Sequence, residues 1–389
     1  MMAGERRTLR LLVTGGGTGG HTYPALTTVM ALRDYAVGRG FDFDVLWVGT
    51  ESGLEARVSA EHGIPFRAIK AGKLRRSPNL RELATNVADM FRVPIGVLQA
   101  FGVAARYRPD VVLSTGGYVC VPLGVASRLL GRPLVMHEQI TALGLANRIL
   151  SRFARRIALT HPSSIEHLPA GARERAVVTG NPIRPHLLRG NVDAARRHFG
   201  LAHGFPLVYV TGGAQGSRQI NTLIEEILPA LLTRAQVIHQ CGPDWIGRFT
   251  EAAAALPAEL RDRYRPVAYV GGELPHVFAA ADVVVSRSGA GTVAELTAVG
   301  KASVLIPLVP SAADEQRQNA RYLAEAGAAR ALLDDKPTAD RLLAELDLLL
   351  RDPATRAAMA GAAQSLGRVD AADALAQVLL AEAEAVKAG

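Results

Sequence analysis

Residues 10–21 have the sequence Arg-Leu-Leu-Val-Thr-Gly-Gly-Gly-Thr-Gly-Gly-His, in which an apolar run leads directly into a cluster of glycines. The run over 10–14 predicts a β-strand, and the pattern over 24–38 predicts a helix, so the glycines form a strand-to-helix turn. Glycines at such a turn let backbone N–H groups approach an anion, and the start of the helix adds partial positive charge. The spacing of Gly15, Gly17 and Gly20 is that of a dinucleotide-binding loop, with an unliganded tight turn as the alternative.

This loop alone does not identify a ligand. A P-loop is excluded because no Lys-Ser or Lys-Thr pair follows the last glycine. An NAD site needs an acidic residue at the end of the second strand, and Glu51 lies some distance past that strand's apolar run. His21 ends the loop, where a helix N-terminus favours the neutral, basic form of imidazole. His21 is therefore a candidate general base, with a structural hydrogen-bonding role as the alternative.

Apolar runs rich in Val and Leu alternate with helical patterns along the rest of the chain. Because these runs are continuous, they are typical of parallel strands covered by helices on both faces. The pattern restarts after the Gly- and Pro-containing segment 179–182, which predicts an α/β fold of two domains, each with a glycine-rich turn near its start. The predicted strands are 10–14, 44–48, 111–115, 134–137 and 156–160, then 207–211, 237–239, 267–270, 283–285 and 303–306; helices are predicted at 54–62, 193–199, 219–232 and 371–387.

The composition is that of a globular chain. Its 389 residues fit two or three domains, and 49% apolar with 21% charged residues exclude disorder for the bulk of the chain. Cys120 and Cys241 are too few for a disulfide framework and favour a reducing compartment. We see no signal-peptide core and no run of about 18 apolar residues, so we expect a cytoplasmic protein without a membrane-spanning helix.

The chain is basic, with 44 Lys and Arg against 36 Asp and Glu, a formal net charge of +8. This surplus allows attraction to nucleic acid, a membrane surface or a phosphorylated substrate. An aromatic share of only 5% and the absence of a recognised module argue against nucleic acid.

Three polar motifs follow predicted strands of the second half. Residues 212–218 follow the first strand, and in 286–296 a strand leads into a helix that starts near Gly291 or Thr292, whose N–H groups would hold a diphosphate. Glu295 lies one turn further on, where it can accept hydrogen bonds from ribose hydroxyls or simply cap the helix. The polar stretch 314–320 suits a hydroxyl-rich sugar, with a solvated helix start as the alternative.

Two motifs of the first half, 114–118 and 137–139, also follow strands. Loops after the carboxyl ends of parallel strands line the ligand crevice of open sheets, so all these motifs converge on such positions. Metal and nucleophile chemistry finds no support: Asp42-Phe43-Asp44 precedes its strand, and neither H-E-x-x-H nor G-x-S-x-G occurs.

Together these motifs resemble the MurG family, the UDP-N-acetylglucosamine–N-acetylmuramyl-(pentapeptide) pyrophosphoryl-undecaprenol N-acetylglucosamine transferases. The resemblance runs from about residue 10 to residue 330. The motifs that carry it, in family order, are GGTGGH at 16–21, STGGY at 114–118, HEQ at 137–139, TGNPIR at 179–184, GGAQGS at 212–217 and SRSGAGTVAE at 286–295.

The resemblance implies two facing Rossmann-like domains with parallel sheets, the GT-B type of glycosyltransferase, over 1–181 and 182–360, with 361–389 as a C-terminal helix that returns to the first domain. It implies inverting transfer of N-acetylglucosamine from UDP-N-acetylglucosamine to the C4 hydroxyl of undecaprenyl-diphosphate-linked muramyl-pentapeptide, for peptidoglycan synthesis. No cofactor or bound metal is required in this scheme.

The resemblance also assigns residues to roles. His21 is the catalytic base. Arg184 and Ser217 contact the diphosphate region, with Gly291 and Thr292 at the helix start, Glu295 on the ribose and Gln316 on the sugar. The remaining donor-binding residues are Thr18, Gly19, Gly20 and Gln215, and the acceptor side consists of Gly116, Gly117, Tyr118, His137, Glu138, Gln139 and Asn147.

Two positions depart from the family pattern. Ile140 replaces the Asn that usually follows His-Glu-Gln, and Glu315 adds a negative charge before Gln316, where the family often has His, Gln or Asn. These differences keep open a UDP-sugar transferase of the same architecture that acts on another lipid or a small molecule. A UDP-sugar epimerase leaves the acceptor-side motifs without a role, and an NAD-dependent oxidoreductase explains only the first glycine loop.

A lipid-linked acceptor requires the enzyme to reach a membrane, so we expect a peripheral protein on the cytoplasmic face. A basic cluster followed by apolar residues suits an anionic bilayer, with a core-facing amphipathic helix as the alternative. The basic residues are Lys70, Lys73, Arg75, Arg76 and Arg81, and the apolar ones are Leu83, Met90, Phe91, Val93, Ile95, Leu98 and Phe101.

Overall fold

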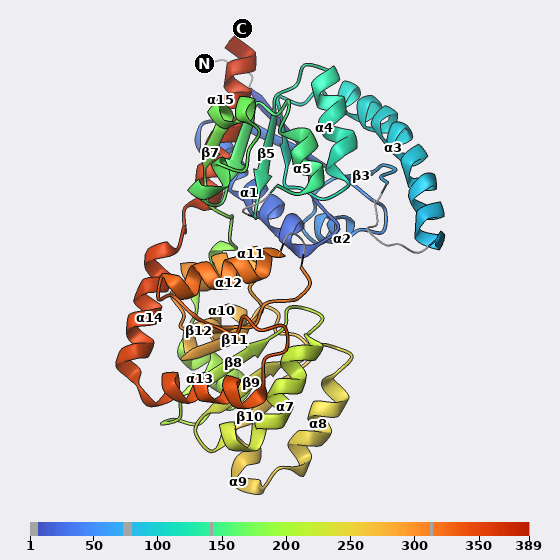
Figure 1. The fold of residues 1–389 in the computed structure, drawn as a ribbon. Helices are drawn as coiled ribbons and strands as arrows, with labels where there is room; N and C mark the ends of the chain where they lie inside the picture. The colour runs from blue at the N-terminus through green and yellow to red at the C-terminus, as the bar shows by residue number, and fades with distance from the viewer. Residues whose placement is uncertain (1–6, 73–79, 141–142, 312–313, 389) are drawn as a thin grey trace. The chain divides into compact units, whose positions relative to one another are not determined.

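The structure is a computed structural model that describes residues 7–72, 80–140, 143–311 and 314–388, without the side chains of 80–91 and 387–388. The chain forms two compact units (Figure 1). Unit 1 consists of Met1–Ile183 and Val369–Gly389, and unit 2 of Arg184–Arg368. The predicted domain boundary after residue 181 thus differs from the structural one by two residues, and the chain returns to unit 1 at Val369 rather than at residue 361.

Unit 1 is built on a sheet in which every recorded strand pair is parallel. The strand order is β3-β2-β1-β4-β5-β6-β7, which contains the 3-2-1-4-5-6 order of a doubly wound Rossmann sheet. The strands are β1 (Thr8–Thr14), β2 (Asp42–Gly49), β3 (Phe66–Ala68), β4 (Val111–Ser114), β5 (Leu134–Glu138), β6 (Arg156–Leu159) and β7 (Ala176–Val178).

Helices cover both faces of this sheet. Leu11 and Val13 of β1 belong to one hydrophobic cluster, whereas Leu12 between them belongs to another, as the two-residue side-chain period of a strand requires. Both faces are therefore buried, which explains the continuous apolar runs. The helices are α1 (Gly19–Gly38), α2 (Leu54–Glu61), α3 (Leu80–Tyr107), α4 (Cys120–Leu129), α5 (Leu145–Leu150), α15 (Ala371–Ala388) and the 3₁₀ turns η1 (Pro162–Ile165) and η2 (Ala170–Arg175).

The C-terminal helix α15 packs against α1 (Figure 1). Its apolar side chains, among them Leu375 and Leu379, join the same cluster as Leu11 and Val13. Glu382 is buried and accepts hydrogen bonds from Arg155 Nε at 3.2 Å and Arg156 Nε at 2.7 Å. The end of the chain is thereby an integral part of unit 1.

Unit 2 repeats the design with the strand order β10-β9-β8-β11-β12-β13, again with parallel pairs. Its strands are β8 (Leu207–Thr211), β9 (Gln236–Gln240), β10 (Tyr264–Val267), β11 (Val283–Ser286), β12 (Ser303–Leu305) and β13 (Arg330–Ala331). Its helices are η3 (Pro185–Arg189), α6 (Val192–Phe199), α7 (Arg218–Leu232), α8 (Ile246–Ala255), α9 (Ala258–Arg261), α10 (Leu274–Ala280), α11 (Ala290–Ala298), α12 (Glu315–Glu325), α13 (Ala339–Arg351) and α14 (Pro353–Leu366). The predicted α/β class with parallel sheets is confirmed in both units.

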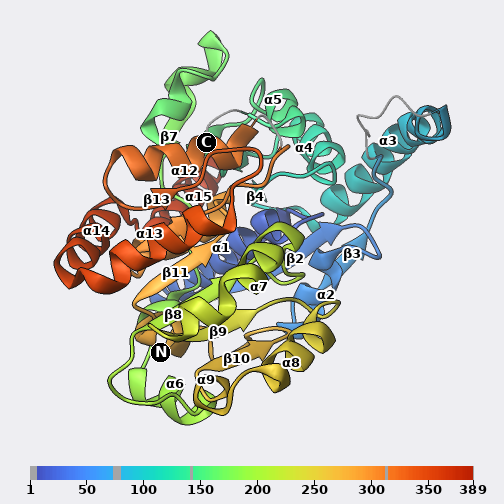
Figure 2. The ribbon, with the colours of Figure 1, turned by 60° about the horizontal axis from the view of Figure 1, so that its bottom comes forward.

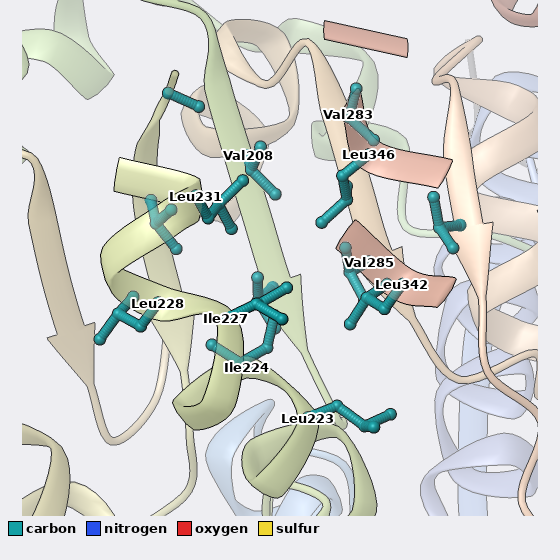
Figure 3. Packing of buried hydrophobic residues seen from close by; sticks show 14 of the residues in the cluster. Val208, Leu223, Ile224, Ile227, Leu228, Leu231, Val283, Val285, Leu342 and Leu346 are labelled. Carbon is teal, nitrogen blue, oxygen red and sulfur yellow. The ribbon is translucent and has the colours of Figure 1, made fainter. Parts of the chain in front are cut away.

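One face of the unit 2 sheet is covered by α7 and α13, which lie over β8, β9 and β11 (Figure 2). Figure 3 shows how Ile224 and Ile227 of α7 and Leu342 of α13 meet the strand side chains Val208 and Val285. All five are at most 3% exposed. At roughly 1.5–3 kcal/mol for each buried Val, Leu or Ile, this layer is a major source of the unit's stability.

The sequence prediction of strand 267–270 is wrong. The strand is β10, which ends at Val267, and Val270 is buried because it packs in the core after the strand. Pro266 fits β10 because this strand lies at the sheet edge, where a missing N–H costs no ladder bond. The helix predicted at 24–38 begins earlier, at Gly19.

Candidate functional site

Three loops of unit 1 meet at the carboxyl edge of its sheet. The strand register places Thr14 beside Ser114, and Ser114 beside Met136. The segments that follow these strands, 15–18, 115–119 and 139–144, therefore leave the sheet side by side, although the last includes two residues outside the described ranges. The sequence motifs placed after these strands are thus brought together.

Two of these loops approach so closely that glycines are needed. A Cβ on Gly15 would collide with the Thr115 hydroxyl, and a Cβ on Gly117 would collide with the Gly16 carbonyl. Gly117 also has φ of 89°, a conformation that side chains disfavour. The glycines therefore join the first loop to the second, while Thr18 and Gly20 stay exposed.

His21 lies in the first turn of α1 and faces the second loop. Its Nδ1 lies 2.9 Å from the Thr115 carbonyl oxygen and 3.1 Å from Gln139 Oε1. Burial lowers the pKa of His21 below its usual 6.5, although these two hydrogen bonds oppose the shift. The imidazole is therefore neutral near pH 7, as a general base requires.

His137 and Gln139 lie beneath this site, both less than 5% exposed. Gln139 Nε2 contacts the Thr115 carbonyl at 2.7 Å and His137 Nδ1 at 3.1 Å. His137 Nε2 contacts the Gly180 carbonyl at 2.9 Å, and burial lowers the pKa of His137 to about 4. The resemblance assigned both residues to the acceptor side, but in this structure they bond to the unit's own backbone and to each other.

Glu138 and Asn147 hold the third loop in the same way. Glu138 Oε2 accepts hydrogen bonds from Asn147 Nδ2 at 2.9 Å and from the Gly144 N–H at 3.2 Å, and Oε1 accepts one from the Ile140 N–H at 3.3 Å. Both side chains are buried, and burial raises the pKa of Glu138. These contacts hold the backbone at Ile140 and Gly144, on either side of the two residues that lie outside the described ranges. The loop after β4 contributes Gly116, Gly117 and Tyr118 to this edge of the sheet. The Tyr118 ring lies beside Gly17.

Sequence reasoning missed Glu55, which is fully buried under the first glycine loop. Its carboxylate accepts hydrogen bonds from the Gly17 N–H at 3.1 Å, the Thr50 N–H at 2.9 Å and the Thr50 hydroxyl at 2.8 Å. Side chains at Gly16, Gly49 or Gly53 would collide with it. The only sign of this role in the sequence is the presence of glycine at all three of these positions.

Unit 2 has an equivalent edge. The register places Thr211 beside Ser286 and Ser286 beside Leu305, so the loops after β8, β11 and β12 leave the sheet together. Arg287, which the sequence analysis did not single out, connects these segments. Its Nη1 donates to Gln219 Oε1 at the start of α7 and to the carbonyls of Ile306 and Pro307 after β12.

The glycine-rich loop after β8 is locked against the end of β9. A Cβ on Gly216 would collide with the Cys241 carbonyl, and φ at Gly216 is 74°. Ser217 is buried and its Oγ accepts a hydrogen bond from the Ile220 N–H at 3.3 Å, so it caps the start of α7. Gln215 is exposed at the tip of the loop.

Arg184 and Glu295 form an ion pair within unit 2. Arg184 Nη2 and Nε lie 2.8 and 3.1 Å from the same Glu295 oxygen, and both side chains are about four-fifths buried. Burial raises the pKa of Glu295, and the guanidinium opposes that shift. Glu295 lies on α11, one turn after Gly291 and Thr292, so three of the predicted donor residues share one short helix.

The start of α12 is fastened to the start of α11. The backbone carbonyl of Gln316 accepts a hydrogen bond from the Ser288 hydroxyl at 2.7 Å. Its side-chain Oε1 accepts another from the Leu308 N–H at 3.0 Å. Glu315 Oε1 accepts from the Ala290 N–H at 3.2 Å, and Asn319 Nδ2 donates to the Ser288 carbonyl at 3.0 Å. Gln316 is thereby held beside the helix start expected to bind a diphosphate.

Within the described residues, no group of three or more His, Cys, Asp or Glu side chains is arranged to hold a metal ion. The same part of the chain contains no helix with the length and hydropathy to cross a membrane. Of the predicted basic cluster, Lys73, Arg75 and Arg76 lie outside the described residues, as do the side chains of Arg81, Leu83, Met90 and Phe91.

Comparisons with known proteins agree with this arrangement. The model of the glycosyltransferase family 28 N-terminal domain matches residues 11–159, and that of the family 28 C-terminal domain matches residues 207–375. The chain is 37% identical over 380 residues to a UDP-N-acetylglucosamine–N-acetylmuramyl-(pentapeptide) pyrophosphoryl-undecaprenol N-acetylglucosamine transferase of Desulforudis audaxviator, covering 95% of this chain and 98% of the relative. It is 39% identical to the protein of that name from Salinibacter ruber, and the match covers 97% of this chain and 98% of the relative.

Among solved structures, MurG of Acinetobacter baumannii matches with a TM-score of 0.72 and 25% identity, over 96% of this chain and 99% of that one. The matches cover both units, and the predicted resemblance is confirmed. The chain therefore belongs to the MurG family of UDP-N-acetylglucosamine–N-acetylmuramyl-(pentapeptide) pyrophosphoryl-undecaprenol N-acetylglucosamine transferases.

Proposed function

We propose that this protein transfers N-acetylglucosamine from UDP-N-acetylglucosamine to the C4 hydroxyl of undecaprenyl-diphosphate-linked N-acetylmuramyl-pentapeptide, a step of peptidoglycan precursor synthesis. The observation that carries the proposal is the identity of 37–39% over nearly the whole chain to two transferases with that name. The arrangement of polar groups in the two units supports it.

Unit 2 binds the donor in this proposal. The N–H groups at the start of α11, at Gly291 and Thr292, receive the diphosphate, because a helix N-terminus attracts anions. Glu295 accepts hydrogen bonds from the ribose hydroxyls, and Gln316 contacts the sugar. Arg184 and Ser217 act near the diphosphate, so Arg184 exchanges part of its contact with Glu295 for one with the donor.

Unit 1 supplies the general base. His21 Nε2 takes the proton from the acceptor hydroxyl as its oxygen attacks the anomeric carbon. The new bond joins that oxygen to the carbon, and the bond from the carbon to the UDP oxygen breaks on the opposite side, with inversion. The negative charge that develops on UDP is stabilised by the N–H groups of α11.

The scheme uses no metal ion, because the helix N-terminus and Arg184 provide the positive potential at the leaving group. We expect transfer to continue in the presence of EDTA. Loss of activity in EDTA, restored by Mg²⁺, would contradict this part of the proposal.

We also propose that unit 1 rests on the cytoplasmic surface of an anionic membrane. Ile95, Leu98 and Phe101 of α3 are 43%, 74% and 38% exposed. Their spacing of three residues places them on neighbouring positions of one helix face. Exposed Lys70 precedes this helix, in the basic cluster read from the sequence. An apolar face beside basic residues matches the interfacial region of an anionic bilayer.

The deciding experiment is a transfer assay with radiolabelled UDP-N-acetylglucosamine and the undecaprenyl-diphosphate-linked muramyl-pentapeptide acceptor. Label should appear in the lipid product, and His21→Ala should lower turnover roughly 10²- to 10⁴-fold, the usual contribution of general base catalysis. Donor binding without transfer would point to a different acceptor, and near-normal turnover in His21→Ala would reject the base.

A further inference from the structure

The three polar side chains below the unit 1 loops form a continuous hydrogen-bonded line. It runs from the Gly180 carbonyl to His137, from His137 to Gln139, and from Gln139 to His21, with contacts of 2.9, 3.1 and 3.1 Å. The Thr115 carbonyl contacts both Gln139 Nε2 and His21 Nδ1. The direction of every hydrogen bond in this line follows from its two carbonyl groups.

The Gly180 carbonyl determines which atom donates in the first hydrogen bond. A carbonyl oxygen only accepts, so His137 Nε2 must carry a proton. Because burial lowers the pKa of His137 to about 4, the ring is neutral near pH 7 and carries one proton only. His137 Nδ1 is therefore an acceptor, and Gln139 must turn its NH₂ group towards it.

The second direction comes from Thr115. Its carbonyl accepts a hydrogen bond from the same Gln139 NH₂ group, which fixes the amide orientation a second time. Gln139 Oε1 then faces His21 Nδ1. Since both neighbours of this nitrogen, Oε1 of Gln139 and the carbonyl of Thr115, are acceptors, His21 Nδ1 must be protonated.

We infer that Gln139 and His137 are positioning residues that, together with the Thr115 carbonyl, hold His21 in the tautomer with an unprotonated Nε2. This inference rests on the proposed function, in which Nε2 takes the acceptor proton. It gives the His-Glu-Gln motif a role behind the base instead of on the acceptor. A base in the other tautomer would present a proton to the hydroxyl that it must deprotonate, so the line of hydrogen bonds determines what fraction of the enzyme is competent.

The tautomer can be read without measuring activity. In the protein labelled with ¹⁵N-histidine, long-range ¹H–¹⁵N correlation near pH 7 should show His21 protonated at Nδ1. His239 in unit 2 is an internal control of the opposite kind. Asn221 Nδ2 donates to the Cys241 carbonyl, so Asn221 Oδ1 faces His239 Nε2 at 3.2 Å and requires a proton there.

Gln139→Met removes both polar ends of the amide at similar length. The Thr115 carbonyl still faces His21 Nδ1 in this variant, so we expect the Nδ1–H form to lose only part of its population. We expect kcat to fall roughly 10- to 100-fold, the range found for the outer hydrogen-bond partners of metal-bound histidines. KM for UDP-N-acetylglucosamine should change less than about twofold, because the residues proposed to contact the diphosphate, the ribose and the sugar lie in unit 2. Gln139→Glu should raise the pKa of His21, since a carboxylate then faces Nδ1–H, and should move the acidic limb of the pH–rate profile to higher pH.

The wild-type spectrum needs no variant, so a poorly folded mutant does not prevent the test. A wild-type His21 protonated at Nε2, or unchanged kcat in a folded Gln139→Met protein, would overturn this inference. Near-normal turnover of His21→Ala would instead reject His21 as the base, and absence of transfer to the muramyl acceptor by the wild type would contradict the proposed function, whatever tautomer the spectrum shows.

Discussion

Arg184 places two nitrogens, Nη2 and Nε, on a single carboxylate oxygen of Glu295, at 2.8 and 3.1 Å. The pair joins the first residue of unit 2 to the helix that starts at Ala290. Because both side chains are about four-fifths buried, removal of either one leaves the other charge poorly solvated. The two residues should therefore act on donor binding as one group.

We predict that Glu295→Ala weakens binding of UDP-N-acetylglucosamine by about 10- to 100-fold. A hydrogen bond to a charged group contributes about 1.5–3 kcal/mol, and this variant loses the ribose contact together with the position of Arg184. In a double-mutant cycle with Arg184→Ala, measured by calorimetry, the two effects should fall short of additivity.

The control is the ion pair of Glu225 and Arg248 in the same unit, with N and O atoms 2.7 Å apart and Arg248 60% exposed. Its removal should leave donor affinity unchanged. Equal losses in both cycles would mean that Glu295 acts through general stability and not through the ribose.

Glu55 should stabilise the first glycine loop. Glu55→Ala removes the carboxylate that accepts hydrogen bonds from the N–H groups of Gly17 and Thr50, and loss of a hydrogen bond to a charged group costs about 1.5–3 kcal/mol. We expect unit 1 to lose roughly 3 kcal/mol of unfolding free energy, and Glu55→Gln to lose less because its amide oxygen still accepts.

The two tryptophans allow this to be measured for one unit. Trp47 is buried in unit 1 and Trp245 lies in unit 2, so denaturation of a Trp245→Phe background, followed by fluorescence, reports on unit 1. Exposed Glu51 in the same segment provides the matched control. Equal stability of the Glu55→Ala and Glu51→Ala proteins would show that the Glu55 hydrogen bonds contribute nothing to the unfolding free energy of unit 1.

The sequence predicts the sheets well because each central strand is buried on both faces. β1, β4, β5, β8 and β11 are therefore short stretches dominated by Val and Leu, without the period of an amphipathic helix. The strands that it misses, β3, β7 and β13, have two or three residues and lie at or near the sheet edges, where pairing and not hydrophobicity defines them.

The polar network is less accessible to sequence reasoning. Gln139 and His137 are oriented by the carbonyls of Thr115 and Gly180, and any residue type supplies a carbonyl. The sequence therefore places the two side chains at the carboxyl end of the correct strand but cannot distinguish a buried structural residue from one that contacts substrate. Glu55 is hidden for a related reason, since an acid in the first turn of a helix is ordinarily a solvated residue.

Glu315 should oppose donor binding. Its carboxylate accepts a hydrogen bond from the Ala290 N–H at the start of α11, where the donor diphosphate is expected, and burial raises its pKa. Glu315→Gln keeps an acceptor and removes the charge. We expect UDP-N-acetylglucosamine to bind about two- to fivefold tighter, because a charge at a helix N-terminus changes the free energy by roughly 0.3–1 kcal/mol. The gain in affinity should be larger at low salt.

Glu251→Gln makes the same chemical change at an exposed position of α8 and should not alter the affinity. Weaker donor binding in Glu315→Gln would show that the carboxylate contacts the sugar directly.

The pH dependence of the reaction should follow His21. Burial lowers its pKa below 6.5, so the neutral base predominates at pH 7 and is lost as the pH falls through that lower pKa. The ratio kcat/KM should therefore be level around neutral pH and decline on the acid side. An acid limb centred above 6.5 in the wild type would contradict the assignment, provided that far-UV circular dichroism shows a folded protein throughout.

The final prediction concerns the exposed apolar face of α3, formed by Ile95, Leu98 and Phe101. Leu98→Glu places a charge at the most exposed of the three, which is 74% accessible. Burial of a Leu side chain contributes about 1.5–3 kcal/mol, so partial insertion lost in this variant should weaken binding to anionic vesicles about tenfold. Sedimentation with vesicles that contain phosphatidylglycerol measures this.

Leu129→Glu is the matched control, because Leu129 is 65% exposed on α4 of the same unit. It adds the same charge to the same unit, so a purely electrostatic effect would lower vesicle binding in both variants. Loss of binding in Leu98→Glu alone, with transfer to a short-chain acceptor in detergent retained, locates membrane contact on α3. Equal binding of both variants and the wild type would exclude this face and assign any membrane attachment to another part of the chain.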